Sequence, residues 1–427
     1  MLDRKFIIAN LEAVRDNCRI RKVNVDLDAL PSLDERYRML SSDLESVNQE
    51  SKAHAKSLSD LKGKPDEAAL HQGRELKNRK SQIESELRVL DQEILSIQTA
   101  IPNMTDPRAP IGDDDTANEE IERGKTPVPQ FDFPAKDHVA LADELSLVDF
   151  EGGSRVAGHG FYFLRGAAVR LELALQQFAL DVLENEGFTI FSTPELAKLN
   201  VLTGTGYNPR DTESNSYTLA NNELGLIATS EIPLAGLHMD AIFDSEDLPL
   251  FLGGISHCFR TEAGAYGRAG RGLYRVHQFS KVEMFAYTRP DQSSDVHMKL
   301  RAIEQHIFDS LEVPYRVVEN ATGDLGNAAY RKFDLEAWMP GKGDGGDWGE
   351  ITSASNCTDY QSRRLGIRYR DPGSNKVAGF AHTLNGTAIS SARAIISILE
   401  NNQQPDGSVR IPKALQPWMN SDTISAK

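Results

Sequence analysis

The hydrophobic pattern separates a helical N-terminal part from a longer part of mixed character. In the first helical stretch, apolar or aromatic residues recur at spacings of 4, 3, 4 and 3, at Leu33, Tyr37, Leu40, Leu44 and Val47. After the breaker Lys62–Asp66, the same repeat returns at Ile83, Leu87, Leu90, Ile94, Ile97 and Ile101. A heptad seam of this kind is typical of helices that pack along their length. The pattern therefore predicts an antiparallel helical hairpin over about 31–101, which would project roughly 45 Å.

Residues 102–135 interrupt this periodicity with six prolines around the acidic stretch Gly112–Asp115. Prolines at this density break regular elements, so the stretch is interpreted as a linker. From about residue 136, helical patterns such as Val169–Glu186 mix with strand-like runs such as Leu224–Thr229, without repeating strand–helix–strand units. We therefore expect an α+β fold, with helices packed on an antiparallel sheet. The expected parts are an N-terminal domain over 1–103, a linker over 104–135 and a main domain over 136–427.

Composition narrows the class of protein. Of 427 residues, 40% are hydrophobic and 26% are charged, which is ordinary for a globular protein. The net charge of −16 argues against a protein that coats nucleic acid through its overall field. Cys18, Cys258 and Cys357 are far apart and show no metal-ligand spacing, so we expect no structural zinc and a reducing compartment. With no leader-like start and no long apolar run, the expectation is a cytoplasmic protein without a membrane span.

The predicted hairpin departs locally from this acidic average. Eight basic residues stand against four acidic ones between Lys52 and Lys80. Such a balance is typical of a solvated coiled-coil tip, and it also suits an arm that contacts the phosphates of RNA. Both interpretations stay open, and under the second we expect Lys52, Lys56, Arg74 and Lys77 to make the contacts.

The segment 257–285 combines the groups that a nucleotide-activating site needs. It is predicted to form a strand, a loop rich in glycine and arginine, and a second strand. Alternation would place Arg260 and Glu262 on one face of the first strand, and Phe279 and Glu283 on one face of the second. The loop between them contributes Arg268, Arg271 and Arg275. Guanidinium groups suit a polyphosphate, an aromatic ring suits a base, and carboxylates suit an amine or a hydroxyl.

The common nucleotide-binding signatures do not accompany this segment. The glycine-rich stretch Gly341–Gly346 lacks the Gly-Lys-Ser/Thr ending of a Walker A loop. The segment instead resembles motif 2 of class II aminoacyl-tRNA synthetases, through Phe259-Arg260-Thr261-Glu262 and His277-Gln278-Phe279. Residues Asn385–Arg393, which lead into an apolar helix, resemble motif 3, and Val169–Pro194 resembles motif 1, the dimer-forming element.

Further stretches narrow the resemblance to the seryl-tRNA synthetase family: Thr229–Leu234, Glu350–Asn356, Thr383–Gly386 and the helical hairpin. The resemblance implies an ATP-dependent class II ligase that makes seryl-adenylate and pyrophosphate from L-serine and ATP, then transfers serine to the 3′ end of serine tRNA. It also implies a homodimer, a catalytic domain over 136–427 and an N-terminal arm that grips the tRNA. Activity on selenocysteine tRNA stays open.

The resemblance implies a set of ATP-binding residues: Arg260, Thr261, Glu262, Arg275, Val276, Phe279, Glu350, Ile351, Thr352, Ser353 and Arg393. Arg260 and Arg393 would be catalytic, and Arg260 would hold the α-phosphate and the serine carboxylate, because its fork donates to two oxygens. Phe279 would stack on adenine, with Arg393 on the other side of the base, while Glu262 would accept from the adenine amino group. Arg275 would reach the terminal phosphate. Glu350 and Ser353 would hold Mg²⁺.

The resemblance also implies serine-binding residues: Thr229, Ser230, Glu231, Arg260, Glu283, Asn385 and Thr387. Glu283 and Thr387 would bind the serine hydroxyl, because a buried acceptor rejects an analogue that lacks this group. Lys281 would share the face of Glu283, and no role is assigned to it.

Alternative functions remain open at this point. A relative that loads serine onto a carrier protein would keep the adenylate site and would typically lack the arm. A non-catalytic coiled-coil scaffold that binds RNA would carry the motif residues by coincidence. A housekeeping enzyme and an antibiotic-resistant duplicate would look almost the same.

Overall fold

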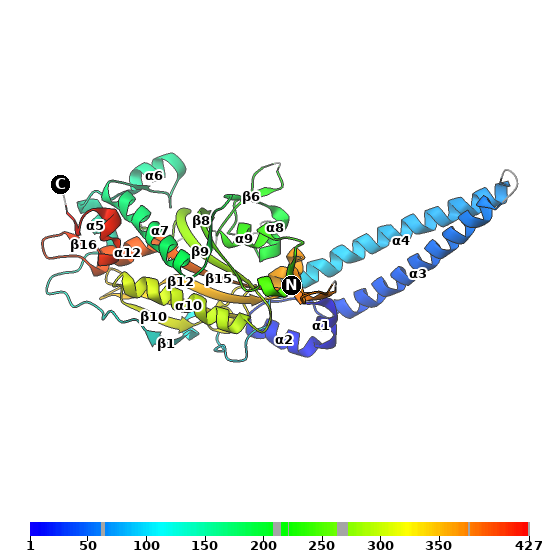
Figure 1. Cartoon of the computed structure of the whole chain (residues 1–427), viewed down its shortest axis with the longest axis horizontal. Helices are drawn as coiled ribbons and strands as arrows, with labels where there is room; N and C mark the ends of the chain where they lie inside the picture. The colour runs from blue at the N-terminus through cyan, green and yellow to red at the C-terminus, as the bar shows by residue number, and fades with distance from the viewer. Residues whose placement is uncertain (61–64, 208–214, 221, 263–271, 375, 426–427) are drawn as a thin grey trace. The chain divides into compact units, whose positions relative to one another are not determined.

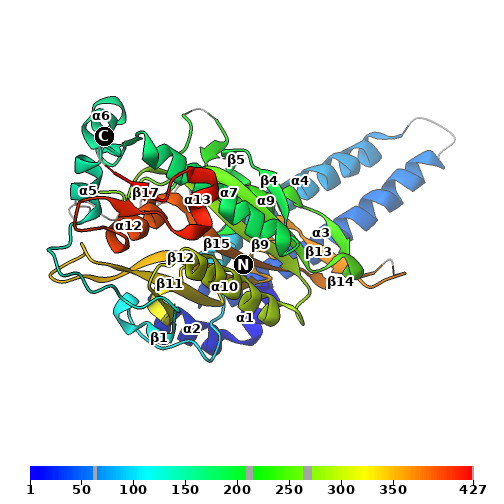
Figure 2. The same cartoon turned by 60° about the vertical axis from the view of Figure 1, so that its left-hand side comes forward.

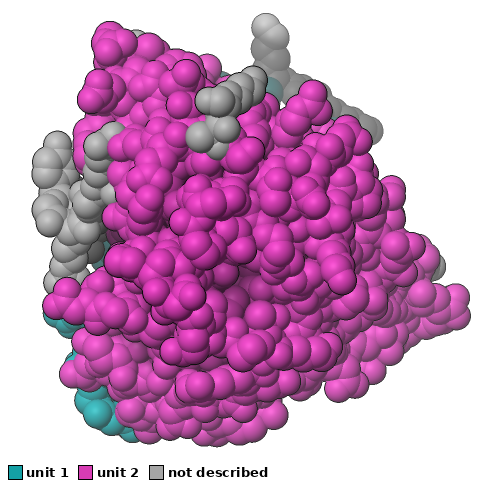
Figure 3. Space-filling view, turned by 90° about the vertical axis from the view of Figure 1, so that its left-hand side faces the viewer, with its two compact units in different colours: residues 1–104 teal, residues 105–427 magenta. Residues whose placement is uncertain are grey.

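The computed structural model describes residues 1–60, 65–207, 215–220, 222–262, 272–374 and 376–425. Over these residues the chain forms two compact units, Met1–Met104 and Thr105–Lys427 (Figure 3). Residues 62–64 of the predicted breaker lie outside the described residues, as do the loop arginines Arg268 and Arg271.

Unit 1 contains the predicted helical hairpin. Its elements are α1 (Arg4–Ala9), α2 (Leu11–Ile20), α3 (Ala29–Ser59) and α4 (Glu67–Ala100). The long helices α3 and α4 lie side by side and antiparallel (Figure 1). At the start of α4, the Asp66 side chain accepts a hydrogen bond from the backbone N–H of Ala69 at 2.8 Å, which caps the helix. The predicted hairpin is therefore confirmed.

The heptad positions form the seam between α3 and α4. In the half of the hairpin near the chain's first helices, Leu30, Ile94 and Ile101 are buried in one cluster. Farther along, Val47 and Ile83 are buried in a second cluster. Fully burying an aliphatic side chain of this size contributes about 2 kcal/mol. Packing along the seam, more than helix propensity, stabilises helices of this length.

In the described residues, the core of unit 2 is an eight-stranded sheet in the order β1-β10-β11-β12-β15-β9-β8-β4. Neighbouring strands pair antiparallel, except β4 and β8, which are parallel. This arrangement confirms the predicted α+β class. The strands are β1 (Glu119–Arg123), β4 (Thr189–Ser192), β8 (Leu250–Phe259), β9 (Gln278–Thr288), β10 (Tyr315–Glu319), β11 (Arg331–Met339), β12 (Asp347–Thr358) and β15 (His382–Ser390).

One face of this sheet is covered by α7 (Ala167–Asn185), α10 (Ser293–Ser310) and α12 (Ser391–Asn401) (Figures 1 and 2). Alternation along β9 shows how the sequence specifies this face. Val282 and Met284 are fully buried in the core beneath the helices. Lys281 and Glu283 alternate with them and line a cavity on the opposite face. The other face is only partly covered. Farther along β9, Phe285 and Tyr287 on that face are buried in a second core cluster, while Lys281 and Glu283 border the cavity.

Shorter elements surround the sheet. A small sheet has the strand order β14-β13-β7, and short strand pairs join β2 to β3, β5 to β6 and β16 to β17. These elements are α5 (His138–Glu144), β2 (Val148–Asp149), α6 (Phe150–Ala157), β3 (Phe163–Leu164), β5 (Leu196–Lys198), α8 (Leu199–Thr205), β6 (Leu224–Leu226), α9 (Glu231–Leu237), β7 (Ile242–Asp244), α11 (Tyr360–Leu365), β13 (Arg368–Arg370), β14 (Val377–Phe380), β16 (Val409–Arg410), α13 (Gln416–Met419) and β17 (Thr423–Ile424).

Part of the predicted linker belongs to the sheet. β1 (Glu119–Arg123) pairs antiparallel with β10 at the sheet edge, with all five of its residues exposed. None of the prolines of residues 102–135 falls within this strand, so its backbone N–H groups remain able to join the ladder. The interpretation that prolines break regular structure along this stretch was therefore wrong for this strand and for the short 3-10 helix Asp115–Ala117. Where the functional domains begin and end stays a prediction.

The three cysteines, all within the described residues, are buried thiols. Among the helices that the structure describes, none is long and apolar enough to span a lipid bilayer.

Candidate active site

The predicted strand–loop–strand segment forms β8 and β9, which pair antiparallel up to Phe259 and Gln278. The pattern predicts that Arg260 and Glu262 share one face of the first strand. This prediction was wrong, because β8 ends at Phe259 and both residues follow it. Glu262 adopts a left-handed backbone with φ of +50°, which breaks the alternation. Both side chains nevertheless line the same cavity.

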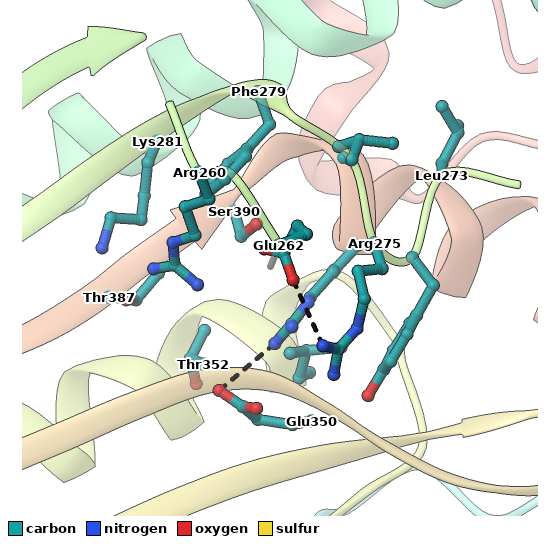
Figure 4. Close-up of a pocket in the computed structure, with 15 residues that line it drawn as sticks. Arg260, Glu262, Leu273, Arg275, Phe279, Lys281, Glu350, Thr352, Thr387 and Ser390 are labelled. Carbon is teal, nitrogen blue, oxygen red and sulfur yellow. Dashed lines mark hydrogen bonds and ion pairs between the residues drawn. The ribbon is translucent and has the colours of Figure 1, made fainter. Parts of the chain in front are cut away.

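The first cavity gathers residues predicted to bind ATP (Figure 4). They come from β9 and the segments that flank the hairpin loop, from β12 and from the start of α12. The predicted residues that line it are Arg260, Glu262, Arg275, Val276, Phe279, Glu350, Ile351, Thr352 and Arg393. Stretches that lie more than a hundred residues apart in the sequence thus meet at one place.

Ion pairs cross the first cavity. Arg393 Nη1 lies 3.2 Å from Glu350 Oε1, and Arg275 Nη1 lies 3.2 Å from Glu262 Oε2 (Figure 4). Burial acts to raise the pKa of Glu350, but the positive charge of Arg393 and of other nearby cations outweighs burial and lowers this pKa to about 2. The Glu350 side chain is 41% exposed, so an ionised carboxylate faces the cavity.

Guanidinium groups also cover aromatic rings here. Arg260 Cζ lies 5.2 Å from the ring centre of Phe279, and Arg393 Cζ lies 4.8 Å from the ring centre of Tyr274. Both distances fall in the range of cation–π attraction. Tyr274 lines the first cavity, and the sequence pattern did not single it out, because it lies between the strands, where period-2 alternation gives no information.

A second cavity gathers residues predicted to bind serine, together with Ser353: Glu231, Arg260, Glu283, Asn385 and Thr387. It adjoins the first cavity, and both are lined by Arg260, Lys281, Glu350 and Thr387. Thr387 and Glu283 are register partners on β15 and β9, and Thr387 Oγ1 donates to Glu283 Oε2 at 3.3 Å.

Lys281, to which no role was assigned, pairs with Glu283. Its Nζ lies 2.5 Å from Glu283 Oε2, and the two side chains are only 6% and 3% exposed. Burial raises the pKa of Glu283, while the Lys281 charge and the hydrogen bonds from Lys281 and Thr387 act in the opposite direction. A buried ammonium needs such a partner. Because Lys281 shares a face with Glu283, the sequence could have indicated that it lies near the site. Alternation alone, however, does not show whether that face lines a cavity or is covered by other elements.

A buried network surrounds Glu231, the first residue of α9. Gln361 Nε2 donates to Glu231 Oε1 at 2.6 Å, and Asn385 Nδ2 donates to the same oxygen at 3.0 Å. Burial, followed by the negative charge of Glu283, raises the pKa of Glu231 to about 7. This carboxyl group therefore changes its charge near neutral pH. Gln361, far away in sequence, carries no motif signal that could have predicted its place here.

Three predicted residues, all within the described ranges, lie outside both cavities. Thr229 is buried, and its Oγ1 accepts a hydrogen bond from the backbone N–H of Glu231 at 3.2 Å. Ser230 is fully buried, and its hydroxyl lies 2.9 Å from Ser256 Oγ on β8. Thr261 lies past the end of β8, between Arg260 and Glu262. Thr229 thus contacts the backbone of Glu231, and the Ser230 hydroxyl contacts β8.

A bulge in β12 brings Glu350 and Ser353 to the same cavity. The pairing register with β11 skips Ile351, which adds one residue to β12 at this point. In a regular strand, residues three positions apart would point to opposite faces. An ionised carboxylate and a hydroxyl on one face suit Mg²⁺, which prefers hard oxygen ligands. Over the described residues, no group of three or more His, Cys, Asp and Glu side chains is arranged to hold a metal ion.

Comparisons with known proteins agree with this geometry. The family model described as "Seryl-tRNA synthetase N-terminal domain" matches residues 1–105, and the one described as "tRNA synthetase class II core domain (G, H, P, S and T)" matches residues 217–402. A serine–tRNA ligase of Rhodopirellula baltica is 53% identical over 428 residues, which cover 100% of both chains. The chain belongs to the seryl-tRNA synthetase family. The predicted resemblance is thereby confirmed.

Solved seryl-tRNA synthetases share the fold. The enzyme from Pyrococcus horikoshii, complexed with ATP, matches with a TM-score of 0.88 and 38% identity, covering 100% of both chains. The cytoplasmic serine–tRNA ligase from Naegleria fowleri, in complex with AMP, matches with a TM-score of 0.82 and 32% identity, covering 98% of this chain and 96% of that chain. As a seryl-tRNA synthetase, the chain is a class II aminoacyl-tRNA synthetase. The roles of single residues stay predictions.

Proposed function

We propose that this chain activates L-serine with ATP to form seryl-adenylate and pyrophosphate, and then transfers serine to the 3′ end of serine tRNA. The observation that supports this reaction most directly is the junction of the two cavities at Arg260. On one side lie cations and aromatic rings, and on the other side lie buried carboxylates and amides. A reaction that joins a nucleotide to a small amino acid needs both sites to meet at the reacting atoms.

The first step is written as attack of a serine carboxylate oxygen on the α-phosphorus of ATP, with cleavage of the bond to pyrophosphate. Alignment and charge neutralisation dominate such a transfer, and little acid–base catalysis is needed. Arg260 would hold the α-phosphate and the serine carboxylate together. Phe279 would stack on adenine, and Arg393 would cover the base from the other side. ATP would also replace an existing ion pair, drawing Arg275 to the terminal phosphate and Glu262 to the adenine amino group.

Glu350 and Ser353 would hold Mg²⁺ through an ionised carboxylate and a hydroxyl oxygen. When bound, the ion would neutralise charge on the phosphates.

Serine recognition is proposed to rest on buried polar groups in the second cavity. The serine hydroxyl would donate to Glu283. The Glu283 carboxylate is held by Lys281, whose Nζ lies 2.5 Å from Oε2, and by the Thr387 hydroxyl, which donates to the same oxygen. Glu231, supported by Asn385, would attract the α-ammonium group. An amino acid without the hydroxyl would not supply Glu283 with the donor that serine provides, and rejection of this kind can reach roughly 10⁴-fold.

In the second step, a terminal ribose hydroxyl of the tRNA attacks the carbonyl carbon of seryl-adenylate, and AMP leaves. The proposed tRNA contacts are Lys52, Lys56, Arg74 and Lys77, all exposed on the outer half of α3 and α4. Self-association as a homodimer and a cytoplasmic location are part of the proposal, and family membership supports both. Activity on selenocysteine tRNA stays open.

Charge removal on the arm should weaken tRNA charging and spare adenylate formation. Changing the four arm cations to glutamine should raise the KM for serine tRNA by about 10-fold or more near physiological salt, because phosphate contacts dominate such binding. The salt dependence of tRNA binding should decrease by up to about one unit of slope for each lost contact. Charging and pyrophosphate exchange assays over a salt series measure both effects. The control removes the exposed cations Lys5 and Arg19, which lie outside the hairpin. An unchanged KM for tRNA would remove the arm from the proposal.

Serine binding should tighten as the pH rises through about 7. The pKa of Glu231 stands at about 7, and only its ionised form attracts the serine ammonium group. Below this pH the carboxyl group is protonated, so the KM for serine should rise by up to about tenfold per pH unit. Exchange assays between about pH 5.5 and 8.5 measure the profile, and E231Q should show a weaker, nearly flat profile over the same range.

The same shift has a consequence for stability. Because the folded-state pKa of Glu231 lies above the unfolded value, the folded protein favours the protonated form. The stability that this preference contributes is present below about pH 4.5 and is lost as the pH rises through about 7. E231Q should therefore gain stability over the native chain at pH 8, as measured by urea unfolding, and the gain should shrink toward pH 5. A constant difference at all pH values would contradict the assignment.

Two assays test the proposed function. Serine-dependent exchange of pyrophosphate into ATP tests the first step, and charging of serine tRNA tests the second. The full chain should perform both, and a chain without residues 31–101 should exchange without charging. Exchange without charging by the full chain would favour the carrier-protein alternative, and absence of exchange would overturn the proposal.

A further inference from the structure

A buried carboxylate at the end of α12 joins segments that are far apart in the sequence. Glu400 is 1% exposed. Its Oε1 accepts from the backbone N–H of His138 at 2.9 Å and contacts His138 Nδ1 at 2.7 Å. Its Oε2 accepts from the backbone N–H of Gly341 at 2.8 Å. Both carboxylate oxygens are thus engaged, and the imidazole ring of His138 is held in one orientation.

The second ring nitrogen of His138 contacts the hairpin segment of the first cavity. The backbone N–H of Leu273 donates to His138 Nε2 at 3.1 Å. A backbone amide can only donate, so Nε2 must carry the lone pair, and Nδ1 must carry the hydrogen that points to Glu400. The two contacts therefore require the same neutral tautomer. The His138 side chain is 13% exposed, so water competes little for either contact.

The chain passes unusually close to this imidazole. Gly272, directly before Leu273, has φ of +151°, and an added Cβ would stand 2.5 Å from His138 Nε2. A glycine is therefore required both for the backbone conformation and for the close approach. The requirement at Gly272 and the hydrogen bond at Leu273 point to the same fixed path for this segment.

That path leads directly into the first cavity. All four residues of 273–276 line it, including Tyr274 and Arg275. Arg393, in the first turn of α12, lies over the Tyr274 ring, while Glu400 lies in the last turn of the same helix. The contacts Glu400–His138–Leu273 thus connect the end of α12 to the segment that faces its beginning.

We propose that His138 is a positioning residue for ATP binding. Through Leu273 it sets where Tyr274 and Arg275 stand relative to Arg393, and Glu400 sets the orientation of His138. The inference rests on the proposed function, because it assigns the first cavity to ATP. The competing explanation is that His138 only anchors the start of α5 to α12, in which case its loss would reduce stability without acting on one substrate in particular.

Two substitutions separate the two ring nitrogens. The amide of H138N reaches about as far as Nδ1, so it can keep the contact with Glu400, and it leaves Leu273 without an acceptor. The longer amide of H138Q reaches about as far as Nε2, so its oxygen can accept from Leu273. H138N should raise the KM for ATP in serine-dependent exchange by about 10-fold, the effect of one lost buried hydrogen bond. The KM for serine should stay within about twofold, and H138Q should recover most of the ATP affinity.

Thermal unfolding and calorimetric binding of ATP complete the test. Thermal unfolding measures how much stability each substitution removes. A loss of stability alone would not raise the KM for ATP while leaving the KM for serine unchanged. In calorimetry, which needs no turnover, the affinity for ATP should be highest in the native chain, lower in H138Q and lowest in H138N. If H138N does not fold, H138A replaces it, because alanine also leaves the backbone N–H of Leu273 without its acceptor. A rise confined to the KM for ATP supports the proposal, and equal rises of both KM values or no rise overturn it.

The native chain is measured first, so that failure of the proposed function can be told apart from failure of the role proposed for His138. Absence of exchange by the native chain would overturn the proposed function itself. Exchange by the native chain, together with a native KM for ATP in folded H138N, would overturn the role of His138 and leave the proposed function standing.

Discussion

Replacing Arg260 by glutamine should lower serine-dependent pyrophosphate exchange by about 10³-fold, as expected when a donor that stabilises transition-state charge is removed. Arg260 lines both cavities, where the α-phosphate and the serine carboxylate would meet. Its guanidinium also covers the Phe279 ring, so the substitution removes a contact on the adenine side. Arg260→Lys should recover little activity, because an ammonium group cannot donate to two oxygens in a planar fork. Initial rates of exchange at saturating ATP and serine measure the loss.

The control for Arg260 is Arg19→Gln, which removes an arginine whose side chain is 72% exposed in unit 1. That variant should retain native exchange. Circular dichroism and thermal unfolding should show that Arg260→Gln is folded. A folded Arg260→Gln enzyme within about tenfold of the native rate would remove Arg260 from the reaction centre.

Replacing Glu283 by alanine should abolish serine-dependent exchange while the fold stays intact. The buried carboxylate is the proposed acceptor for the serine hydroxyl, and losing the hydroxyl contact can cost about 10⁴-fold in selectivity. The change also leaves the Lys281 ammonium without the carboxylate that lies 2.5 Å away. Removing one partner of a buried pair destabilises by about 3 kcal/mol, so Glu283→Ala should be less stable in urea unfolding than the native chain.

A double variant separates recognition from stability. Lys281→Met with Glu283→Ala removes both buried charges, so it should recover much of the lost stability and remain inactive with serine. The ratio of serine to alanine activation, measured in the same assay, should fall steeply in Glu283→Gln. Near-normal exchange in Glu283→Ala, or an unchanged serine-to-alanine ratio in Glu283→Gln, would contradict the proposed acceptor.

Periodicity predicted the parts of the fold in which one face of an element is buried along its whole length. The heptad positions of the hairpin, such as Val47 and Ile83, form the seam because a helix repeats its face every 3.6 residues. Alternation also placed Phe279 and Glu283 on one face of β9, and both line the adjoining cavities. Where a regular element continues through a motif, the sequence is sufficient to predict which residues share a face.

Prediction failed where the backbone leaves its regular path. β8 ends before Arg260, and Glu262 takes a left-handed conformation, which no alternation rule includes. The bulge at Ile351 depends on the register with β11, a strand that is separate in the sequence, so the common face of Glu350 and Ser353 could not be predicted from spacing. The exposed strand Glu119–Arg123 has a single apolar residue, Ile121, so it shows no alternation of apolar and polar residues.

The sequence did not predict the placement of other residues, because that placement depends on which elements pack around them in the fold. Lys281 has the spacing of a cavity residue, but only the packing of helices on the opposite face shows that β9 carries a cavity on this one. His138 lies before the main catalytic motifs, and its relation to Leu273 arises from the fold alone. Tertiary contacts of this kind leave no local signal in a single sequence.

ATP and serine are proposed to meet at Arg260, which lines both of the adjoining cavities. A crystal structure of the chain with a non-hydrolysable analogue of seryl-adenylate tests this proposal most directly. We expect adenine stacked on Phe279, the phosphate-like group at Arg260, and the serine hydroxyl within about 3 Å of a Glu283 oxygen. An analogue bound away from Arg260, or one whose hydroxyl points away from Glu283, would overturn the proposed meeting of ATP and serine at Arg260.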